Sequence, residues 1–435
     1  MSSEQRAAPA SHRKNPARVL LPLGLAVFCS LFGDLTLYAV LAMQREAVGI
    51  SLASVGIMLG INRLVRIPGN PVVGLLQDKR GRKPLFVLGM GIGTLSVAGF
   101  GLLRGFWPFL VARAGWGIAW TLINVGGMTM VIDISTPANR GKLNGLYNIA
   151  LWLGFAGGPL LGGTLVDVIG FRLTMLVCAC IAGFGFLVAA ALLPETGAAG
   201  PIGGPAGPES RQVEHRLGLT IKPRKWIDSA RKLDPSLLRA TGLTAVVKFV
   251  GEGVTLSTLS LLMAERIGES LSVGSMVLGL STATGIMLAI RSALAGLSGP
   301  IAGHISDAGL GRWSVITGSI VVGIAGSLLL AWAPSLSLIL LGVALAAVSV
   351  GALTSTLAAT VGDMVSAGQQ GTAMGIYATA GDVGSTLGPF LAFALLSTME
   401  LRWIYMICTI ALVLALGLAR GRRPGLSESA ISAQG

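Results

Sequence analysis

Residues 74–84 read GLLQDKRGRKP, and a degenerate copy, GHISDAGLGR, occupies residues 303–312. Each copy follows an apolar stretch long enough to cross a lipid bilayer as a helix, which takes about 20 residues. A short loop with charged residues therefore follows a candidate membrane helix twice in one chain. This pattern predicts a protein of many membrane helices that is built from two related halves.

The repeat extends well beyond these two loops. Pro71, Gly74 and Asp78 correspond to residues 229 positions later, and the remaining matches are 230 apart, so one inserted loop residue explains the change. Such duplication is typical of secondary transporters, whose substrate site lies near the bilayer midplane between the halves. The matches are Pro71 with Pro300, Gly74 with Gly303, Asp78 with Asp307, Arg82 with Arg312, Asp133 with Asp363, Gly141 with Gly371, Gly145 with Gly375, Tyr147 with Tyr377, Gly158 and Pro159 with Gly388 and Pro389, and Arg172 with Arg402.

Composition agrees with a membrane location. The 435 residues are 53% hydrophobic and 12% charged, and the mean hydropathy is +0.76. The long segments are apolar throughout, whereas strands of a membrane barrel alternate apolar and polar residues. We therefore predict an all-α integral membrane protein with twelve spans. The expected spans are 18–44, 51–76, 85–103, 106–132, 142–167, 173–193, 237–263, 274–304, 313–333, 336–362, 370–397 and 401–419.

One long break divides these spans into two groups of six. It begins with a run of Gly, Pro and Ala and continues through a basic segment. We therefore expect one six-helix bundle at 18–193, a cytoplasmic linker at 194–236 and a second bundle at 237–419. Cytoplasmic tails are expected at 1–17 and 420–435.

The placement of basic residues predicts the orientation. The net charge is +13, and most of the 32 Lys and Arg residues fall in the tails, the linker and the loops on one side. Because such residues concentrate on the cytoplasmic side, we expect both termini there, and the excess charge suits anionic lipid and not nucleic acid. The lack of an N-x-Ser/Thr sequon is compatible with a bacterial inner membrane. The loops expected outside contain Arg45, Arg104, Arg172, Arg266 and Arg402.

Cysteine and histidine form no cluster that indicates chemistry. The cysteines all lie inside apolar runs and suit small core residues, and the histidines lie in a tail, the linker and a helix end. We therefore expect no metal, no cofactor and no enzymatic activity. The residues are Cys29, Cys178, Cys180, Cys408, His12, His215 and His304.

The loop at 74–84 resembles the signature loop of the major facilitator superfamily. A loop that only sets orientation needs Lys and Arg, but it does not need Gly74, Asp78 and Gly81 at these places. The resemblance covers essentially the whole chain. It implies the major facilitator fold, with two pseudo-symmetric six-helix bundles, and a protein that functions as a monomer.

The resemblance also implies a contact that closes the cytoplasmic side. In the family the acid at Asp78 docks on the start of the eleventh helix, near residues 370–371, and Gly74 allows close helix contact. Arg82 would then reach Asp133 at the end of the fourth helix. The degenerate copy implies the same roles for Asp307, Arg312 and Asp363. We call these eight residues, Gly74, Asp78, Gly81, Arg82, Asp133, Asp307, Arg312 and Asp363, the latch residues.

Residues 154–163, GFAGGPLLGG, resemble the signature of the antiporter branch of this superfamily. Gly154, Gly158 and Gly162 form one stripe of small residues, followed by Gly163, and Pro159 weakens the local helix. The segment therefore suits a moving interface, although ordinary small-residue packing is the alternative. Residues 194–196, Pro-Glu-Thr, are also common after the sixth helix of drug/proton antiporters.

Ionisable residues inside membrane spans are functional candidates because each costs roughly 2.5–3.5 kcal/mol to insert. Asp34 resembles the acid in the first helix of drug/proton antiporters, although the usual following proline is missing. Arg113 matches the family's arginine implicated in proton coupling, since a nearby cation favours the charged carboxylate and separation favours its protonation. Glu252 aligns with Asp34 between the halves. With Asp382, these residues are the predicted proton-coupling set.

Four cations form the predicted substrate cavity: Arg63, Arg66, Lys248 and Arg291. If the arginines all face one cavity, it favours an anionic or zwitterionic substrate. Alternatively, the arginines pair with the buried aspartates for structure. Lys248 can also neutralise Glu252, four residues later on one helical face.

These observations predict a proton-coupled efflux antiporter of a small organic molecule that works by rocker-switch alternating access. The expected partners are a small-molecule substrate, protons and the lipid bilayer. A symporter or facilitator that imports a small organic anion is the alternative. A receptor or scaffold that does not transport would not need buried charges in both halves.

Overall fold

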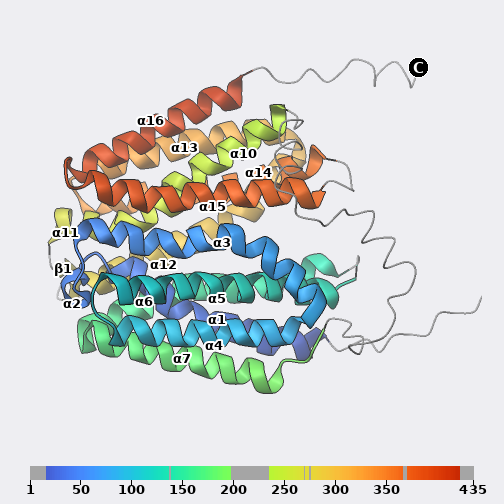
Figure 1. Ribbon diagram of the computed structural model, residues 1–435. Coiled ribbons are helices and arrows are strands. Elements are labelled where there is room, and N and C mark those ends of the chain that lie inside the picture. The colour runs from blue at the N-terminus through green and yellow to red at the C-terminus, as the bar shows by residue number, and fades with distance from the viewer. Residues whose placement is uncertain are drawn as a thin grey trace, which may run out of the picture.

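The computed structural model describes residues 16–136, 139–196, 235–268, 270–273, 276–365 and 370–421. Within these ranges the chain forms a bundle of long helices (Figure 1). The predicted linker and tails lie almost wholly outside the described residues. The α-helices are α1 (Pro16–Val40), α2 (Arg45–Val48), α3 (Leu52–Arg80), α4 (Arg82–Leu102), α5 (Phe106–Asp133), α6 (Arg140–Ile169), α7 (Phe171–Leu192), α10 (Pro235–Lys248), α11 (Leu256–Ile267), α12 (Leu280–Ile305), α13 (Arg312–Trp332), α14 (Leu336–Asp363), α15 (Gln370–Leu395) and α16 (Leu401–Arg420), and the π-helices are η1 (Phe249–Thr255) and η2 (Ser306–Leu310).

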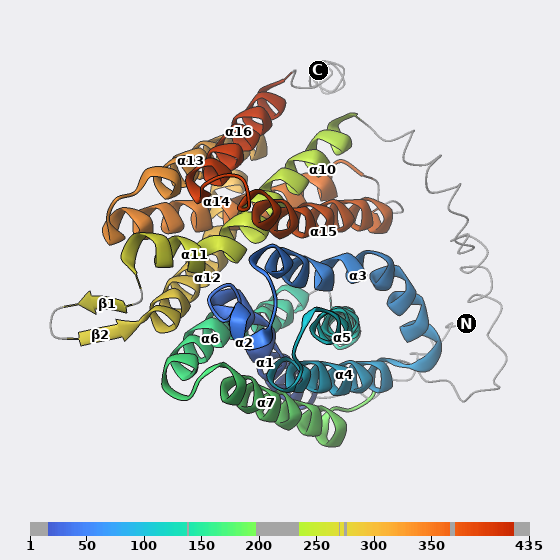
Figure 2. The ribbon, with the colours of Figure 1, turned by 60° about the vertical axis from the view of Figure 1, so that its left-hand side comes forward.

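The helices form two groups, α1–α7 and α10–α16, which we call the two halves (Figure 2). Within the described residues, ten helical segments are long and apolar enough to cross a membrane. The remaining two long helices, α3 and α15, are more polar and lie side by side at the boundary between the halves (Figure 1). Their polar residues face protein and not only lipid, which explains their composition. The predicted all-α membrane fold is confirmed.

One predicted boundary was wrong, and one short helix was not expected. The span predicted to begin at residue 274 starts later, because β1 (Ser270–Val273) pairs antiparallel with β2 (Met276–Gly279) before α12 begins. Alternation of polar and apolar residues in β1 is the strand signal that the continuous apolar pattern concealed. The short helix α2 was also not expected. It ends at Gly49, whose φ of 77° is the left-handed conformation that glycine adopts readily.

Glycine contacts show that the halves are closely packed at the end that carries the β hairpin, which we call the hairpin end. A Cβ atom on Gly163 of α6 would lie 2.2 Å from the Ser281 carbonyl oxygen of α12. A Cβ atom on Gly285 of α12 would lie 2.2 Å from the Pro159 carbonyl oxygen of α6. Both distances are too short for any side chain, so only glycine permits this approach of the two backbones.

At the opposite end, which carries residues 74–84 and which we call the motif end, the halves separate. Cβ atoms on Gly74, Gly145 and Gly375 would meet no described atom within 4 Å. Helix α3, which contains Pro68 and Pro71, bends away from α15 toward this end (Figure 1). No described atom makes the close contact expected at Gly74, and the side chains at the start of α15 lie outside what the structure describes, so that contact stays a prediction.

A polar contact also joins the halves at the hairpin end. Asp167, near the end of α6, accepts hydrogen bonds through Oδ2 from the backbone N and the Oγ1 of Thr282, both at 2.7 Å. Thr282 lies in the first turn of α12, whose backbone N–H groups lack helical partners. The α12 N-cap residue, Gly279, leaves room for this carboxylate, since a Cβ there would lie 2.2 Å from Oδ2. Asp167 thus caps a helix of the other half.

Candidate substrate and coupling site

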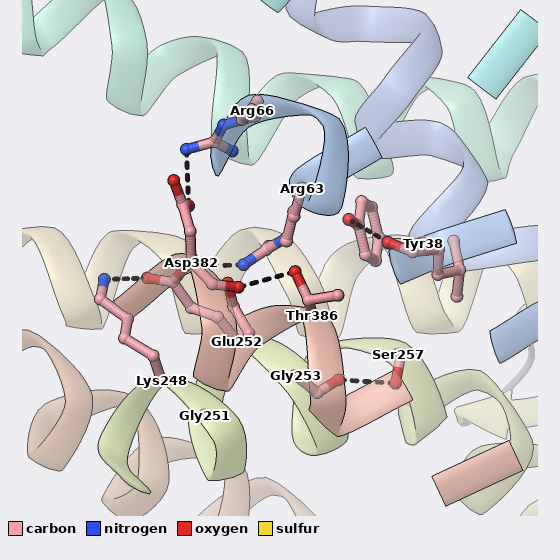
Figure 3. Close-up of polar contacts among 12 residues, drawn as sticks. Tyr38, Arg63, Arg66, Lys248, Gly251, Glu252, Gly253, Ser257, Asp382 and Thr386 are labelled. Atoms are coloured by element: carbon pink, nitrogen blue, oxygen red, sulfur yellow. Dashed lines mark hydrogen bonds and ion pairs between the residues drawn. The ribbon is translucent and has the colours of Figure 1, made fainter. Parts of the chain in front are cut away.

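Two ion pairs cross between the halves where α3, η1 and α15 meet (Figure 3). Arg63 Nη1 lies 3.0 Å from Glu252 Oε2, and Arg66 Nη2 lies 3.0 Å from Asp382 Oδ1. Asn70 donates to Asp382 Oδ2 at 3.5 Å. The three α3 residues lie at helical spacing on one face, so one helix presents all the donors to the opposite half.

The π-helix η1 positions Glu252. Helix α10 widens into η1 from Phe249 to Thr255, and such π segments occur frequently at functional sites. Gly253, next to Glu252, allows α15 to approach, since a Cβ there would lie 2.7 Å from Gly388 Cα. The acid is therefore held by a tightly packed but irregular backbone, opposite α3.

Lys248 and Arg291 complete the charged cluster. Lys248 forms an ion pair with Glu252, as their spacing on one helix allowed. Arg291 of α12 donates from Nη2 to the Gly251 carbonyl oxygen at 2.7 Å, and it has no carboxylate partner among the described residues. Four cations, Arg63, Arg66, Lys248 and Arg291, thus surround two carboxylates, Glu252 and Asp382. With all groups ionised the cluster has a surplus of two positive charges.

A second charged pair lies inside one half. Asp34 of α1 forms an ion pair with Arg113 of α5, whose side chain is fully buried. Arg113 also donates from Nε to the Met58 carbonyl oxygen at 2.7 Å, and Asn62 donates to Asp34 Oδ1 at 3.4 Å. One guanidinium nitrogen of Arg113, Nη2, is buried without a partner among the described atoms. Such an unsatisfied buried polar atom is unusual in a folded protein.

Tyr38 lies between the two clusters and was not singled out from the sequence. The guanidinium carbons of Arg63 and Arg113 lie 5.9 Å and 6.0 Å from the centre of its ring, within the range of cation–π attraction. Tyr38 follows Asp34 by four residues on α1, so helical spacing alone places both on one face. That spacing was the signal that could have identified it.

The antiporter-like segment packs differently from the prediction. Cβ atoms on Gly158 and Gly162 would lie 3.0 Å from Leu35 Cβ and 1.9 Å from Thr36 Oγ1, so the glycine stripe packs on α1 inside one half. Gly154 likewise packs on Leu31 of α1. The stripe therefore makes a close helix contact within one half, and movement at this contact stays a prediction.

Other residues of this segment, Phe155, Pro159, Leu160 and Gly163 among them, lie against α12 of the other half. Proline has no N–H, so Pro159 leaves the carbonyl oxygen of Phe155 without its helical donor. Ser292 of α12 donates to this oxygen at 3.3 Å. Proline thus creates a hydrogen-bond acceptor at the boundary between the halves.

The described latch residues pair within each half and not between the halves. Arg82 Nε lies 3.5 Å from Asp133 Oδ2 in the first half. Arg312 forms an ion pair with Asp363 and lies 3.4 Å from Asp307 in the second. The side chains of Asp78 and of residues 370–371 lie outside what the structure describes, so the predicted docking of Asp78 stays a prediction.

Gly81 and Gly311 show why the two loops share a glycine. They have φ values of 87° and 75°, and each directly precedes the first residue of α4 or α13. Other residues rarely adopt such angles. The repeated glycine therefore turns the chain into the next helix.

Glu195 adds a contact that the sequence pattern did not reveal. Its carboxylate accepts from the backbone N of Arg82 at 2.9 Å and of Lys83 at 3.1 Å, and so caps the start of α4. Thr196 donates to Asp133 Oδ2 at 3.0 Å. The Pro-Glu-Thr segment after α7 therefore stabilises the loop at the motif end.

Solved structures with the same arrangement are transporters. The bacterial homologue of the human lysosomal transporter Spinster, in an inward-facing and unoccupied conformation, has a TM-score of 0.71 and 18% identity, covering 93% of this chain and 97% of that one. The human organic anion transporter MFSD10 (TETRAN) has a TM-score of 0.63 and 20% identity, covering 94% of this chain and 100% of that one. These likenesses show the fold.

Sequence comparison gives the family. The multidrug resistance protein MdtG of Dickeya zeae is 33% identical over 135 residues, which is 31% of this chain and 32% of that protein. Other curated relatives are matched over 33% to 42% of their length. The family model described as Major Facilitator Superfamily matches residues 23–288 and 241–434. With matches that together span almost the whole sequence, and with the fold described above, this chain belongs to the Major Facilitator Superfamily.

Proposed function

We propose that this protein is a proton-coupled antiporter that exports a small organic molecule by rocker-switch alternating access. Membership of the superfamily already makes it a membrane transporter of small molecules. One observation carries the finer proposal: the halves touch at the hairpin end and separate at the motif end, with partly buried ion pairs between them. Packing at one end and separation at the other supports alternating access, in which a central site opens to one side of the membrane at a time.

The proposed topology follows from the charge distribution and the packing. The motif end and both termini face the cytoplasm of a bacterial inner membrane, and bundles 18–193 and 237–419 act as the two moving bodies joined by linker 194–236. The open motif end then corresponds to an inward-facing state. Within each body the helices stay packed, so a monomer suffices for transport.

The proposed coupling site is the pair of Asp34 and Arg113. The pair is buried, lies next to the boundary between the halves, and leaves Arg113 Nη2 unsatisfied. Because both residues lie in one half, the proposed trigger is a side-chain rearrangement within that half: separation of the two side chains favours a protonated Asp34, and restored contact favours proton release. Glu252 and Asp382 are the next candidates, because both already pair across the boundary.

The test uses Asp34→Asn in proteoliposomes loaded with a pH-sensitive dye. A thermal-shift screen of the purified protein against metabolites and drugs first supplies a substrate. We expect the variant to lose transport driven by a proton gradient while it keeps substrate exchange at equal pH. Glu46→Gln, the same chemical change at an acid whose side chain is 87% exposed, serves as the control. If the variant still concentrates substrate against its gradient, Asp34 is not the coupling acid, and Glu252 or Asp382 becomes the candidate.

A second function, import of a small organic anion by symport or facilitation, has its own supporting observation. The cluster between the halves has more cations than carboxylates, and Arg291 has no described carboxylate partner. The direction of net flux in proteoliposomes separates the two functions. Proton movement opposite to the substrate supports export by antiport, and movement together with the substrate supports symport.

A further inference from the structure

The carboxylate of Glu252 has the contacts that a bound anionic ligand would have. One oxygen meets Arg63 of the first half, at 3.0 Å, and the other meets Lys248 of the second half. Both oxygens are therefore engaged by cations, and the two cations come from different halves. A carboxylate held in this way connects the halves as a substrate must during transport.

Glu252 is also the most accessible of the buried acids. Its side chain is 30% exposed, against 10% for Asp34 and 11% for Asp382. Its two cationic partners are less exposed, at 10% for Arg63 and 18% for Lys248. The acid can therefore move out of the cluster more readily than the cations that hold it.

Arg291 provides an alternative partner for a displaced Glu252. It donates to the carbonyl oxygen of Gly251, the residue before Glu252, and its Nε is buried without a partner among the described atoms. Leaving a buried charge unpaired costs several kcal/mol, and a carboxylate that turns from Arg63 to Arg291 avoids that cost.

We propose that Glu252 occupies the position of a substrate carboxylate, and that a small organic monoanion binds between Arg63 and Lys248 by displacing Glu252 toward Arg291. This inference rests on the proposed transport function and names the substrate class of its site. Because the cluster has a surplus of two positive charges, it still has a net positive charge after it binds one monoanion. A cationic ligand is excluded because it would face four cations and only two carboxylates.

The test measures binding to the purified full-length protein by equilibrium dialysis and thermal shift. The probes are small carboxylates, benzoate among them, each paired with its neutral carboxamide. We expect the wild type to prefer at least one carboxylate over its amide. Glu252→Gln removes the internal competitor and should tighten binding of that carboxylate about tenfold, which corresponds to about 1.4 kcal/mol. Arg63→Gln should weaken it by a similar factor and leave the amide unchanged.

Loss of a residue that binds the ligand would weaken carboxylate binding, whereas the proposal predicts that Glu252→Gln tightens it. Weaker or unchanged carboxylate binding in this variant would overturn the proposal, and so would a wild type that prefers no carboxylate in the panel. Glu46→Gln is the control and should match the wild type. The proposed transport function is tested separately. Proton-coupled flux of a neutral or cationic compound would contradict the anion site but would support the proposed antiporter. If Glu252→Gln fails to fold, Arg291→Gln should still weaken carboxylate binding selectively, and equal binding of both probes would overturn the proposal.

Discussion

The contact between Asp167 and Thr282 should stabilise only the conformation that is closed at the hairpin end. Asp167→Ala removes both hydrogen bonds to the first turn of α12. Loss of a helix N-cap typically costs about 1 kcal/mol, and the exposed position of Asp167 gives no reason to expect more. The open form at this end has no such contact to lose. The equilibrium should therefore shift toward it by about fivefold, which is what 1 kcal/mol gives.

Cysteine accessibility measures this shift. Ser281 is 5% exposed and lies against Gly163 at the hairpin end. Ser281→Cys, in a background without the four native cysteines, should react with a membrane-impermeant maleimide about fivefold faster when combined with Asp167→Ala. Asp167→Asn keeps an acceptor oxygen and should have a smaller effect. Thr282→Ala removes only the hydroxyl donor, so its labelling rate should lie between those of the unsubstituted protein and Asp167→Ala. Equal labelling with and without Asp167→Ala, in protein of unchanged melting temperature, would refute this role.

Two further substitutions test the packing at each end. Gly285→Ala places a methyl group 2.2 Å from the Pro159 carbonyl oxygen, so it should disfavour the closed hairpin end by about 1–3 kcal/mol and speed labelling at position 281. Gly145→Ala is the control, because its methyl group meets no described atom, and it should leave the labelling rate unchanged. Unchanged labelling with Gly285→Ala would contradict the close packing at the hairpin end. Glu195→Ala removes the cap of α4 and should speed hydrogen exchange of the Arg82 and Lys83 amides severalfold, and retained protection would show that another group caps this helix.

Helices and local pairs were predictable because their signals are local. Long apolar runs specify spans whatever packs against them, and the pairing of Lys248 with Glu252 follows from four-residue spacing. The polar helix α3 was also predicted, since its length and its place in the repeat compensate for Arg63 and Arg66. The hairpin before α12 was not, because its alternating strand β1 has only four residues and lies directly before a long apolar run.

Pairings between the halves were not predictable from one sequence. Arg63 and Glu252 are 189 residues apart, and several acids of suitable depth competed for each arginine. The glycine stripe shows the same limit: its spacing predicted a face for close packing, but not that α1 of the same half would occupy it. Asp167 and Glu195 were missed because a carboxylate that caps a distant helix has no periodic signature.

The pairing of Asp34 with Arg113 has an electrical consequence. Moving one elementary charge through a membrane potential changes the energy by about 2.3 kcal/mol per 100 mV, but these two charges lie in one half and, while they stay paired, move together as a neutral unit. The surplus cations around Arg291 are not compensated in this way. Movement of the empty cluster through the field is therefore sensitive to voltage, and a bound monoanion reduces that sensitivity. Membrane voltage should act more strongly on the empty protein than on the loaded one.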